Sequence, residues 1–260
     1  MGPRADRVVA VSAAAGAPIA LWAVPRSRST AFLRVMLERG DLEVVHEPFS
    51  YLVQDGHFEV AGRRVSTMPS LLEALLELDN GGRRVFFKDT SDYRYDALLA
   101  DSRLYTGVVN TFMIRDPAAA VASHYAMHPG VTLDEIGFEY LHTMFEAVRQ
   151  ATGEVPLVID GDDVVADPPG MVRAYCERVG LAFVGEAMQW RPGAKPAWQR
   201  TERWHQEVAN STGLVAKTSS HREHAGNNPH LRELVAHHQP FYEAMRAHRL
   251  LPRPNVHSGQ

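Results

Sequence analysis

The sequence predicts an α/β protein with one central, mostly parallel sheet flanked by helices. Short apolar runs typical of buried strands alternate with amphipathic stretches typical of helices along the first two thirds of the chain. This alternation indicates βαβ units, whose strands lie parallel. The 260 residues are 45% hydrophobic and 22% charged, which fits one large globular domain.

The first half predicts four strand and helix pairs. The expected strands are PIALWAV at 18–24, EVV at 43–45, RVFFKD at 84–89 and TFMIRD at 111–116. The expected helices cover 31–39, 69–78, 92–99 and 117–127. The last of these has a clear start signal, because Asp116 can cap it and Pro117 suits the first helical position.

The second half predicts a long helix over 133–151, a strand at 156–160 and a helix from Pro168 to Val179 that Gly180 ends. Residues 185–227 are rich in Trp, Pro and Gly and lack periodicity, which indicates a long ordered loop over the expected ligand site. A surface helix is expected over 229–249. We therefore expect a single domain over 18–250, with a flexible leader at 1–17 and a flexible tail at 251–260.

Composition narrows the function classes. A net charge of −4 disfavours a general nucleic-acid binder, which needs a strongly basic face. Cys176 is the only cysteine, so neither an intramolecular disulfide nor a thiolate zinc cluster is possible, and a reducing, cytoplasmic location is expected. No apolar run approaches the ~20 residues of a membrane span, so no membrane association is expected.

The segment PRSRST at 25–30 predicts an anion site. It follows a buried strand and begins a helix, so helix N–H groups and the helix dipole favour a phosphate or sulfate there. Arg26 and Arg28 add guanidinium groups, and Ser27, Ser29 and Thr30 add hydroxyl donors. The alternative is that Ser29 or Thr30 only caps the helix while the arginines are solvated.

A second strand, loop and helix supports the anion site. Arg115 stands at the end of the strand in TFMIRDPAAAVAS, and Ser123 lies eight residues later. Ligands of open parallel sheets bind beyond the carboxyl ends of the strands, where both segments are expected.

These two segments together resemble the sulfotransferases that use 3′-phosphoadenosine 5′-phosphosulfate (PAPS). PRSRST is similar to their 5′-phosphosulfate loop, and RDPAAAVAS is similar to their 3′-phosphate motif. Similarity continues through LVIDGDDVVADPPGMVRAYCERVGLAF and through WRPGAKPAW, so it covers about residues 18 to 205. The resemblance implies a P-loop-containing nucleotide-binding fold, PAPS as co-substrate and adenosine 3′,5′-bisphosphate (PAP) as product.

The resemblance also implies roles for single residues. Arg26 is expected to hold the bridging and terminal oxygens, Ser29, Thr30 and helix amides the 5′-phosphate, and Arg115 with Ser123 the 3′-phosphate; Ser27 is also expected to bind the co-substrate. Arg191, Gly193 and Trp198 match a family loop that closes over the 3′-phosphate. Apart from the resemblance, a loop tryptophan can stack on adenine, line the acceptor pocket or only anchor the loop to the core, and Trp198 is favoured over Trp190 and Trp204 for the nucleotide. No metal is required for such a transfer.

Two positions depart from the family pattern. Arg28 replaces the glycine usual in the first loop, which disfavours a positive φ but adds a cation. Pro192 stands where many relatives have a basic residue, which weakens the assignment of Arg191 to the 3′-phosphate.

The transfer also needs a general base. VVHEPF places Glu47 and His46 at the end of the second expected strand, with Glu47 as first choice and His46 as second. The alternative is that one orients the other or caps a turn. Lys88 at the next strand end can stabilise the transferring group, although a lysine extending from a sheet edge is an alternative.

Other chemistry is less favoured. His124 and His128 lack the glutamate of the H-E-x-x-H zinc motif, and DGDDVVAD is more simply an acidic turn before a helix than a magnesium site.

The leading hypothesis is PAPS-dependent sulfation of a small-molecule hydroxyl. The alternatives are a non-catalytic bisphosphate-binding regulatory module and an ATP-dependent kinase, which the missing G-x-x-x-x-G-K-[ST] motif disfavours. The acceptor is not specified, and a homo-oligomer is a further possibility.

Overall fold

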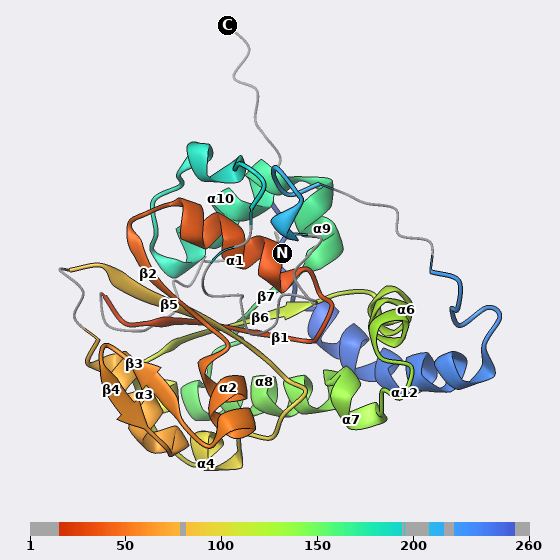
Figure 1. Cartoon of the computed structure of the whole chain (residues 1–260), viewed down its shortest axis with the longest axis horizontal. Coiled ribbons are helices and arrows are strands. Elements are labelled where there is room, and N and C mark those ends of the chain that lie inside the picture. The colour runs from red at the N-terminus through yellow and green to blue at the C-terminus, as the bar shows by residue number, and fades with distance from the viewer. Residues whose placement is uncertain (1–15, 79–81, 194, 196–207, 216–220, 253–260) are drawn as a thin grey trace, which may run out of the picture.

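A five-stranded parallel sheet forms the centre of the molecule (Figure 1). A computed structural model describes residues 16–78, 82–193, 195, 208–215 and 221–252. The strand order is β2-β5-β1-β6-β7. The strands are β1 (Ile19–Ala23), β2 (Leu42–His46), β5 (Arg84–Thr90), β6 (Val109–Ile114) and β7 (Leu157–Asp160). The predicted α/β class, with its parallel sheet, is confirmed.

The register places the first strand at the centre of the sheet. Ile19 of β1 pairs with Phe86 of β5 on one side and with Val109 of β6 on the other. Every residue of β1 and β6 is buried, because helices cover both faces of the sheet. Such strands appear in a sequence as continuous apolar runs, which explains why they were predicted correctly.

Side chains alternate between two cores along β1. Ala20 and Trp22 belong to the core that also contains Phe87 of β5. Ile19, Leu21 and Ala23 belong to the opposite core, which contains Phe86. The sheet therefore separates two apolar layers, as in other α/β folds.

The helices that cover the two faces differ in number. One face carries α1 (Ser29–Glu38), α9 (Gly161–Ala166), α10 (Pro168–Val179) and the short 3-10 helix η1 (Gly185–Met188). The other carries α2 (Pro48–Asp55), α3 (Met68–Leu76), α4 (Asp96–Leu99), α5 (Arg103–Thr106), α6 (Pro117–Met127), α7 (Leu133–Ile136), α8 (Phe138–Thr152) and α12 (Pro229–Arg246). The helix α12 packs on α6 and α8, as its predicted apolar spacing requires.

Some local structure differs from the sequence prediction. The helix expected over 133–151 is divided into α7 and α8 by Gly137, whose φ of +83° ends the first of them. The helix expected over 92–99 is only α4, and α2 and α5 were not predicted. The antiparallel hairpin of β3 (Phe58–Val60) and β4 (Arg63–Val65) was also missed, because three-residue strands show too little alternation.

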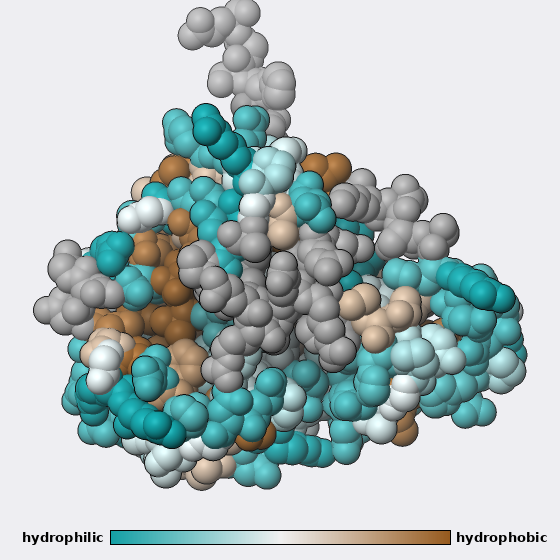
Figure 2. Space-filling model, viewed as in Figure 1, coloured by the Kyte–Doolittle hydropathy of each residue, from teal (hydrophilic) through white to brown (hydrophobic). Residues whose placement is uncertain are grey.

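The surface near the edge strand β2 is partly apolar. Figure 2 shows apolar side chains gathered on one side of this face, over the region where Figure 1 places β2 and β5. Val44 and Val45 of β2 are only partly buried. Among the described residues, no helix combines the length and the apolar character that crossing a bilayer requires.

Candidate active site

The predicted site residues meet at the carboxyl edge of the sheet. Arg26 and its neighbours follow β1, His46 and Glu47 end β2, Lys88 lies near the end of β5, and Arg115 follows β6. Parallel strands bring their carboxyl ends together, so residues far apart in sequence share this edge.

The loop between β1 and α1 adopts positive φ at two arginines. Arg26 has φ +64° and Arg28 has φ +73°, so Arg28 takes the backbone conformation that its side chain was expected to disfavour. The Ser27 hydroxyl is buried and has no hydrogen-bond partner among the described residues. A buried hydroxyl and a strained loop are typical of a binding site shaped around a ligand.

The helix α1 begins directly behind this loop. It starts at Ser29, and its N-cap residue is Arg28, which makes no side-chain cap hydrogen bond. The alternative that Ser29 or Thr30 serves as the N-cap is therefore wrong. The first N–H groups of α1 point out of a ten-residue helix without a side-chain cap, which is the arrangement that binds anions.

Gly161 allows the turn after β7 to approach the loop closely. A Cβ atom at this position would lie far inside contact distance of the Ser27 carbonyl oxygen. Glycine is therefore needed here for a steric reason, although its own φ is not positive.

Four predicted residues form a cation cluster, which we define as Arg26, Arg28, Arg115 and Ser123. The Arg26 Nε donates to the Ser123 hydroxyl at 2.9 Å, and Arg115 donates to the Arg26 carbonyl oxygen at 3.1 Å. The structure thus brings together the two segments expected to bind the two phosphates.

One acidic residue, Asp162, faces the cation cluster. Its Oδ1 accepts from the Nε of Arg28 at 3.2 Å and from the Nε of Arg115 at 3.3 Å. Burial and the neighbouring Arg28 lower the pKa of Arg115, while Asp162 acts in the opposite direction. Asp162 is therefore a counter-ion of Arg28 and Arg115.

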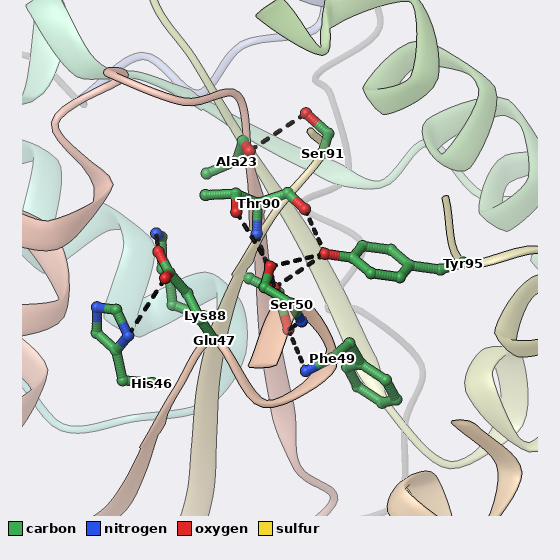
Figure 3. Close-up of polar contacts among 10 residues, drawn as sticks. Ala23, His46, Glu47, Phe49, Ser50, Lys88, Thr90, Ser91 and Tyr95 are labelled. Atoms are coloured by element: carbon green, nitrogen blue, oxygen red, sulfur yellow. Dashed lines mark hydrogen bonds and ion pairs between the residues drawn. The ribbon is translucent and has the colours of Figure 1, made fainter. Parts of the chain in front are cut away.

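A second group, which we call the general-base cluster, consists of His46, Glu47 and Lys88 (Figure 3). Lys88 forms an ion pair with Glu47, whose Oε2 lies 3.6 Å from His46 Nδ1. Lys88 is 1% exposed and lies on β5, between β2 and β1. The alternative of a lysine extending from a sheet edge is therefore wrong.

Glu47 is held in an unusual backbone conformation. Its φ and ψ are both 47°, in the left-handed region, and Pro48 follows it at the start of α2. Its backbone N–H donates to the Lys88 carbonyl oxygen at 2.7 Å. A non-glycine residue in this region costs of order 1–3 kcal/mol, and such residues cluster at functional sites.

Asp89 fastens the start of α2 to β5. Its carboxylate accepts from the backbone N–H of Phe49 at 2.7 Å, from the Ser50 hydroxyl at 2.5 Å and from the Tyr95 hydroxyl at 3.1 Å. Burial raises the pKa of Asp89 to about 7; the Ser50 hydroxyl opposes this shift and the Glu47 carboxylate adds to it. Asp89 thereby positions the turn that carries Glu47.

Two buried histidines border the site. Burial lowers the pKa of His46 to about 4, and Lys88 acts in the same direction. Burial and the nearby Arg26 lower the pKa of His124 to about 4. Both imidazoles are therefore neutral at pH 7.

The segment after η1 is fastened to α1. The buried Arg34 donates to the carbonyl oxygens of Gly193 at 2.9 Å and Arg191 at 3.3 Å. The Arg191 side chain is exposed, and its role at the 3′-phosphate stays a prediction. Trp198 lies outside the described residues, as do most of the expected leader and tail.

Sequence reasoning missed three functional positions. Asp162 was assigned to an acidic turn, which was wrong, because residues 161–166 form the helix α9 directly after β7. Asp89 was not assigned a role, because only the structure shows the amides that it accepts from. Gly161 has no sequence signal of its own beyond its place after a strand.

The comparisons with known proteins identify the family. Residues 17–249 match the sequence profile of the sulfotransferase domain. The chain belongs to the sulfotransferase domain family. The match covers both the cation cluster and the general-base cluster.

Two curated relatives are plant proteins. They are the branched-chain-amino-acid aminotransferase-like proteins 1 and 2 of Arabidopsis thaliana, which are 27% and 25% identical to this chain over 246 residues. Each match covers 87% of this chain but 41% of the relative. The chain thus spans about two fifths of the length of the curated relatives it matches.

Two solved structures share the fold. A sulfotransferase from Alicyclobacillus acidocaldarius has a TM-score of 0.51 at 15% identity, covering 90% of this chain and 97% of its own. The mouse sulfotransferase SULT7A1 complexed with PAP has a TM-score of 0.51 at 14% identity, covering 90% and 89%. The sheet with its strand order is therefore a sulfotransferase fold.

Proposed function

We propose that this protein transfers a sulfuryl group from PAPS to a hydroxyl group of a small molecule. The observation that carries the proposal is the juxtaposition of two clusters at one sheet edge. A cation cluster beside a bare helix N-terminus suits the phosphates of the donor, and the adjacent Glu47 and Lys88 suit the transfer. Membership in the sulfotransferase domain family supports this assignment.

The residues of the first loop fit the donor. The buried Ser27 hydroxyl has no hydrogen-bond partner in the described part of the chain, and the amides at the start of α1 offer further donors. Arg26 and Arg28 supply charge at the 5′ end, and Arg115 with Ser123 supplies the 3′-phosphate site. The mouse neighbour is complexed with PAP, which supports the same donor here.

Glu47 is the proposed general base. Its carboxylate, which is paired with Lys88, is the group proposed to take the proton of the acceptor hydroxyl. The attacking oxygen forms the new O–S bond while the bond from sulfur to the PAP phosphate oxygen breaks. Burial lowers the pKa of His46 to about 4, so His46 is a poor proton acceptor and stays the second choice.

Lys88 and Arg26 are the proposed electrostatic partners of the reaction. Negative charge develops on the leaving phosphate as the bond to sulfur breaks, and cations fixed in advance stabilise it. Lys88 is held by Glu47, and Arg26 is held by Ser123. Positioning and charge stabilisation by protein groups together supply the catalysis in this proposal.

The first test measures thermal unfolding with PAP, with a chelator present, and in parallel with ATP and magnesium. A ligand at a hundred times its Kd stabilises the fold by about 2.7 kcal/mol, which raises the midpoint measurably. We expect a shift with PAP that survives chelation. A shift only with ATP and magnesium would instead favour a kinase.

The second test separates an enzyme from a regulatory module. PAP release from PAPS is followed with a panel of hydroxyl compounds, in the native protein and in Glu47→Gln. A PAP shift with acceptor-dependent release that Glu47→Gln abolishes supports the enzyme. A PAP shift without release from any acceptor supports the non-catalytic module.

A further inference from the structure

A strap of chain lies against α1, the helix that begins at the donor loop (Figure 1). The strap is defined as residues 189–193 together with residues 208–213. Backbone contacts join its two runs and pair Gln189 with Gly213, Trp190 with Thr212, and Gly193 with Ala209. The strap is therefore held together by its own backbone.

The apolar side of the strap packs into the core on the α1 face of the sheet. Trp190 is 7% exposed and shares this core with Leu214 and with Phe32 of α1. Its indole N–H donates to the Ser211 hydroxyl at 3.2 Å. Burial of this indole with its N–H paired already stabilises the strap against α1 without any charged group.

A buried guanidinium adds a second link between the strap and α1. The Arg34 side chain is 4% exposed, and its Nε donates to Glu38 Oε1 at 2.5 Å. Its two terminal nitrogens donate to the carbonyl oxygens of Gly193 at 2.9 Å and Arg191 at 3.3 Å. The guanidinium carbon lies 5.7 Å from the centre of the Trp190 ring. All three nitrogens of Arg34 are thus engaged, which gives the strap backbone a fixed place on the helix.

This guanidinium is a costly way to fill its place in the core. Burying a cation requires desolvation, and the pairing gained often only balances that cost. An apolar side chain of similar length, such as methionine, would fill the same volume without it. The position of Arg34 is therefore better explained by the two carbonyl groups that it fixes than by core packing.

Arg191 and Lys195 have different surroundings. The Lys195 Nζ lies 2.9 Å from Glu38 Oε1, which also pairs with Arg34. Burial raises the pKa of Glu38, but Lys195 and Arg34 outweigh burial and the net shift is downward. Arg191 is exposed and has no carboxylate partner in the described part of the chain. Arg191 is thus the cation of this stretch that is open to an anionic ligand.

The link lies near the donor end of α1. Arg34 stands five residues after Ser29, the first residue of the helix, which is about 7.5 Å along the axis at ~1.5 Å per residue. The side chains of a helix lean toward its N-terminus. The strap therefore meets α1 within about two turns of the donor loop and its cation cluster.

We infer that Arg34 is a positioning residue for donor binding: it fixes the strap backbone on α1 and thereby holds Arg191 ready for the 3′-phosphate. The inference rests on the proposed sulfuryl transfer and adds a residue that acts through another residue and not by contact with the donor. Positioning of this kind raises affinity, because the arginine loses less conformational freedom when the ligand binds. Donor affinity should therefore depend on Arg34 only while Arg191 and the 3′-phosphate are both present.

The experiment compares PAP with adenosine 5′-monophosphate (AMP), which lacks the 3′-phosphate. Affinities are measured by calorimetry on the whole chain. Arg34→Met should weaken PAP binding about tenfold and AMP binding by less than about twofold, because only PAP uses the positioned arginine. Arg34→Lys keeps the charge but not the fork that reaches two carbonyl groups, so it should recover part of the PAP affinity.

A double-variant cycle separates positioning from general destabilisation. Arg191→Ala should weaken PAP binding about tenfold, the usual loss for a charge-assisted hydrogen bond. Arg34→Met should add nothing further in that background, because the group that it positions is gone.

Arg84→Met is the matched control. The half-buried Arg84 also donates to two backbone carbonyl groups, those of Ala17 at 2.5 Å and Val179 at 2.6 Å, but it lies at the amino end of β5. Its loss should lower the thermal midpoint and leave the PAP affinity unchanged. Thermal midpoints of all variants establish which of them are folded.

A variant of the partner carboxylate gives a milder form of the same test. Glu38→Gln keeps the Arg34 guanidinium but removes its charged partner, so it should weaken PAP binding about two- to threefold and leave AMP binding unchanged. Glu59→Gln on the β3–β4 hairpin removes an exposed carboxylate and serves as its control. Where Arg34→Met does not fold, Arg34→Lys and Glu38→Gln decide the question by the same comparison of PAP with AMP.

The outcomes separate this inference from the proposed function. Native PAP affinity in Arg34→Met, equal losses for PAP and AMP, or losses that add up in the double variant would overturn the role of Arg34 even where PAP binds the native protein. Failure of PAP to bind the native protein would overturn the proposed function, and the inference with it.

Discussion

The two clusters at the sheet edge are held in different ways. Glu47 and Lys88 are buried, and Asp89 fixes the turn before α2 by accepting from backbone amides. The cation cluster is held by partners that a phosphate can replace, since Asp162 is 41% exposed along its side chain and binds two arginines through one oxygen. The first cluster is preorganised, whereas in our proposal the second exchanges the Asp162 carboxylate for a phosphate of the ligand.

This difference matches what each cluster has to do. Groups that stabilise a transition state act best when they need no rearrangement during the reaction. Arginines that await a ligand require a temporary counter-ion, because unpaired buried cations are costly. The predictions below test whether the rigid cluster controls the rate and the exchanging cluster controls affinity.

The largest effect is expected for Glu47→Gln. The amide keeps the size of the side chain but cannot take the hydroxyl proton, so the rate of PAP release should fall about a hundredfold or more. Affinity for PAP should change little. Rate and affinity are measured by product formation and calorimetry, and a rate within threefold of the native protein, roughly half a kcal/mol, would remove Glu47 from its role.

Arg115→Ala should weaken PAP binding by about ten- to a hundredfold, the usual loss for a charge-assisted hydrogen bond. Arg115→Lys keeps the charge but not the planar fork, so it should recover only part of the affinity. Arg64→Ala, at an exposed position on β4, is the control. Unchanged affinity in Arg115→Ala would place the 3′-phosphate elsewhere.

Asp89→Asn should destabilise the fold by about 2 kcal/mol, because an amide cannot satisfy all the donors that face the carboxylate. The native carboxyl, with a pKa of about 7, binds a proton between pH 4 and 7 that the unfolded chain releases. Its contribution to stability therefore falls as the pH rises through this range. Denaturation at pH 5 and pH 8 should show a larger advantage of the native protein at pH 5.

The same variant tests positioning as well as stability. If Asp89 orients Glu47, Asp89→Asn should lower kcat about tenfold with KM for PAPS nearly unchanged. If kcat is unchanged, or if kcat and the affinity for PAPS worsen by the same factor, Asp89 has a structural role only. Glu59→Gln should show neither the stability slope nor the change in kcat.

The smallest effect is expected for Asp162→Asn. Removing the exchangeable counter-ion should tighten PAP binding about two- to fivefold, in line with the modest free energy of a partly exposed ion pair. The gain should shrink at high salt, which screens the pair. Weaker binding in this variant would show that Asp162 orients the arginines instead of competing with the ligand.

The sequence predicted the parts of the site that depend on strand ends. PRSRST and the Arg115 to Ser123 segment follow apolar runs typical of buried strands, Glu47 follows the short run EVV of the partly buried edge strand β2, and the structure brings all three to one edge. The contacts of Asp89 and Asp162 could not be predicted. They join segments that are far apart in the sequence, and the spacing of residues along the chain does not show which way a side chain points. The division of 133–151 was missed since one glycine interrupted an otherwise continuous apolar pattern.

Gly161 limits how this enzyme can be redesigned. The turn after β7 shares one wall with the donor loop and leaves no clearance for even a methyl group. Because residue 161 is already glycine, no substitution at this position can enlarge the site for a bulkier donor. Engineering of donor choice has to begin at the opposite rim of the loop, where Ser123 and Arg26 meet and side chains can still be shortened.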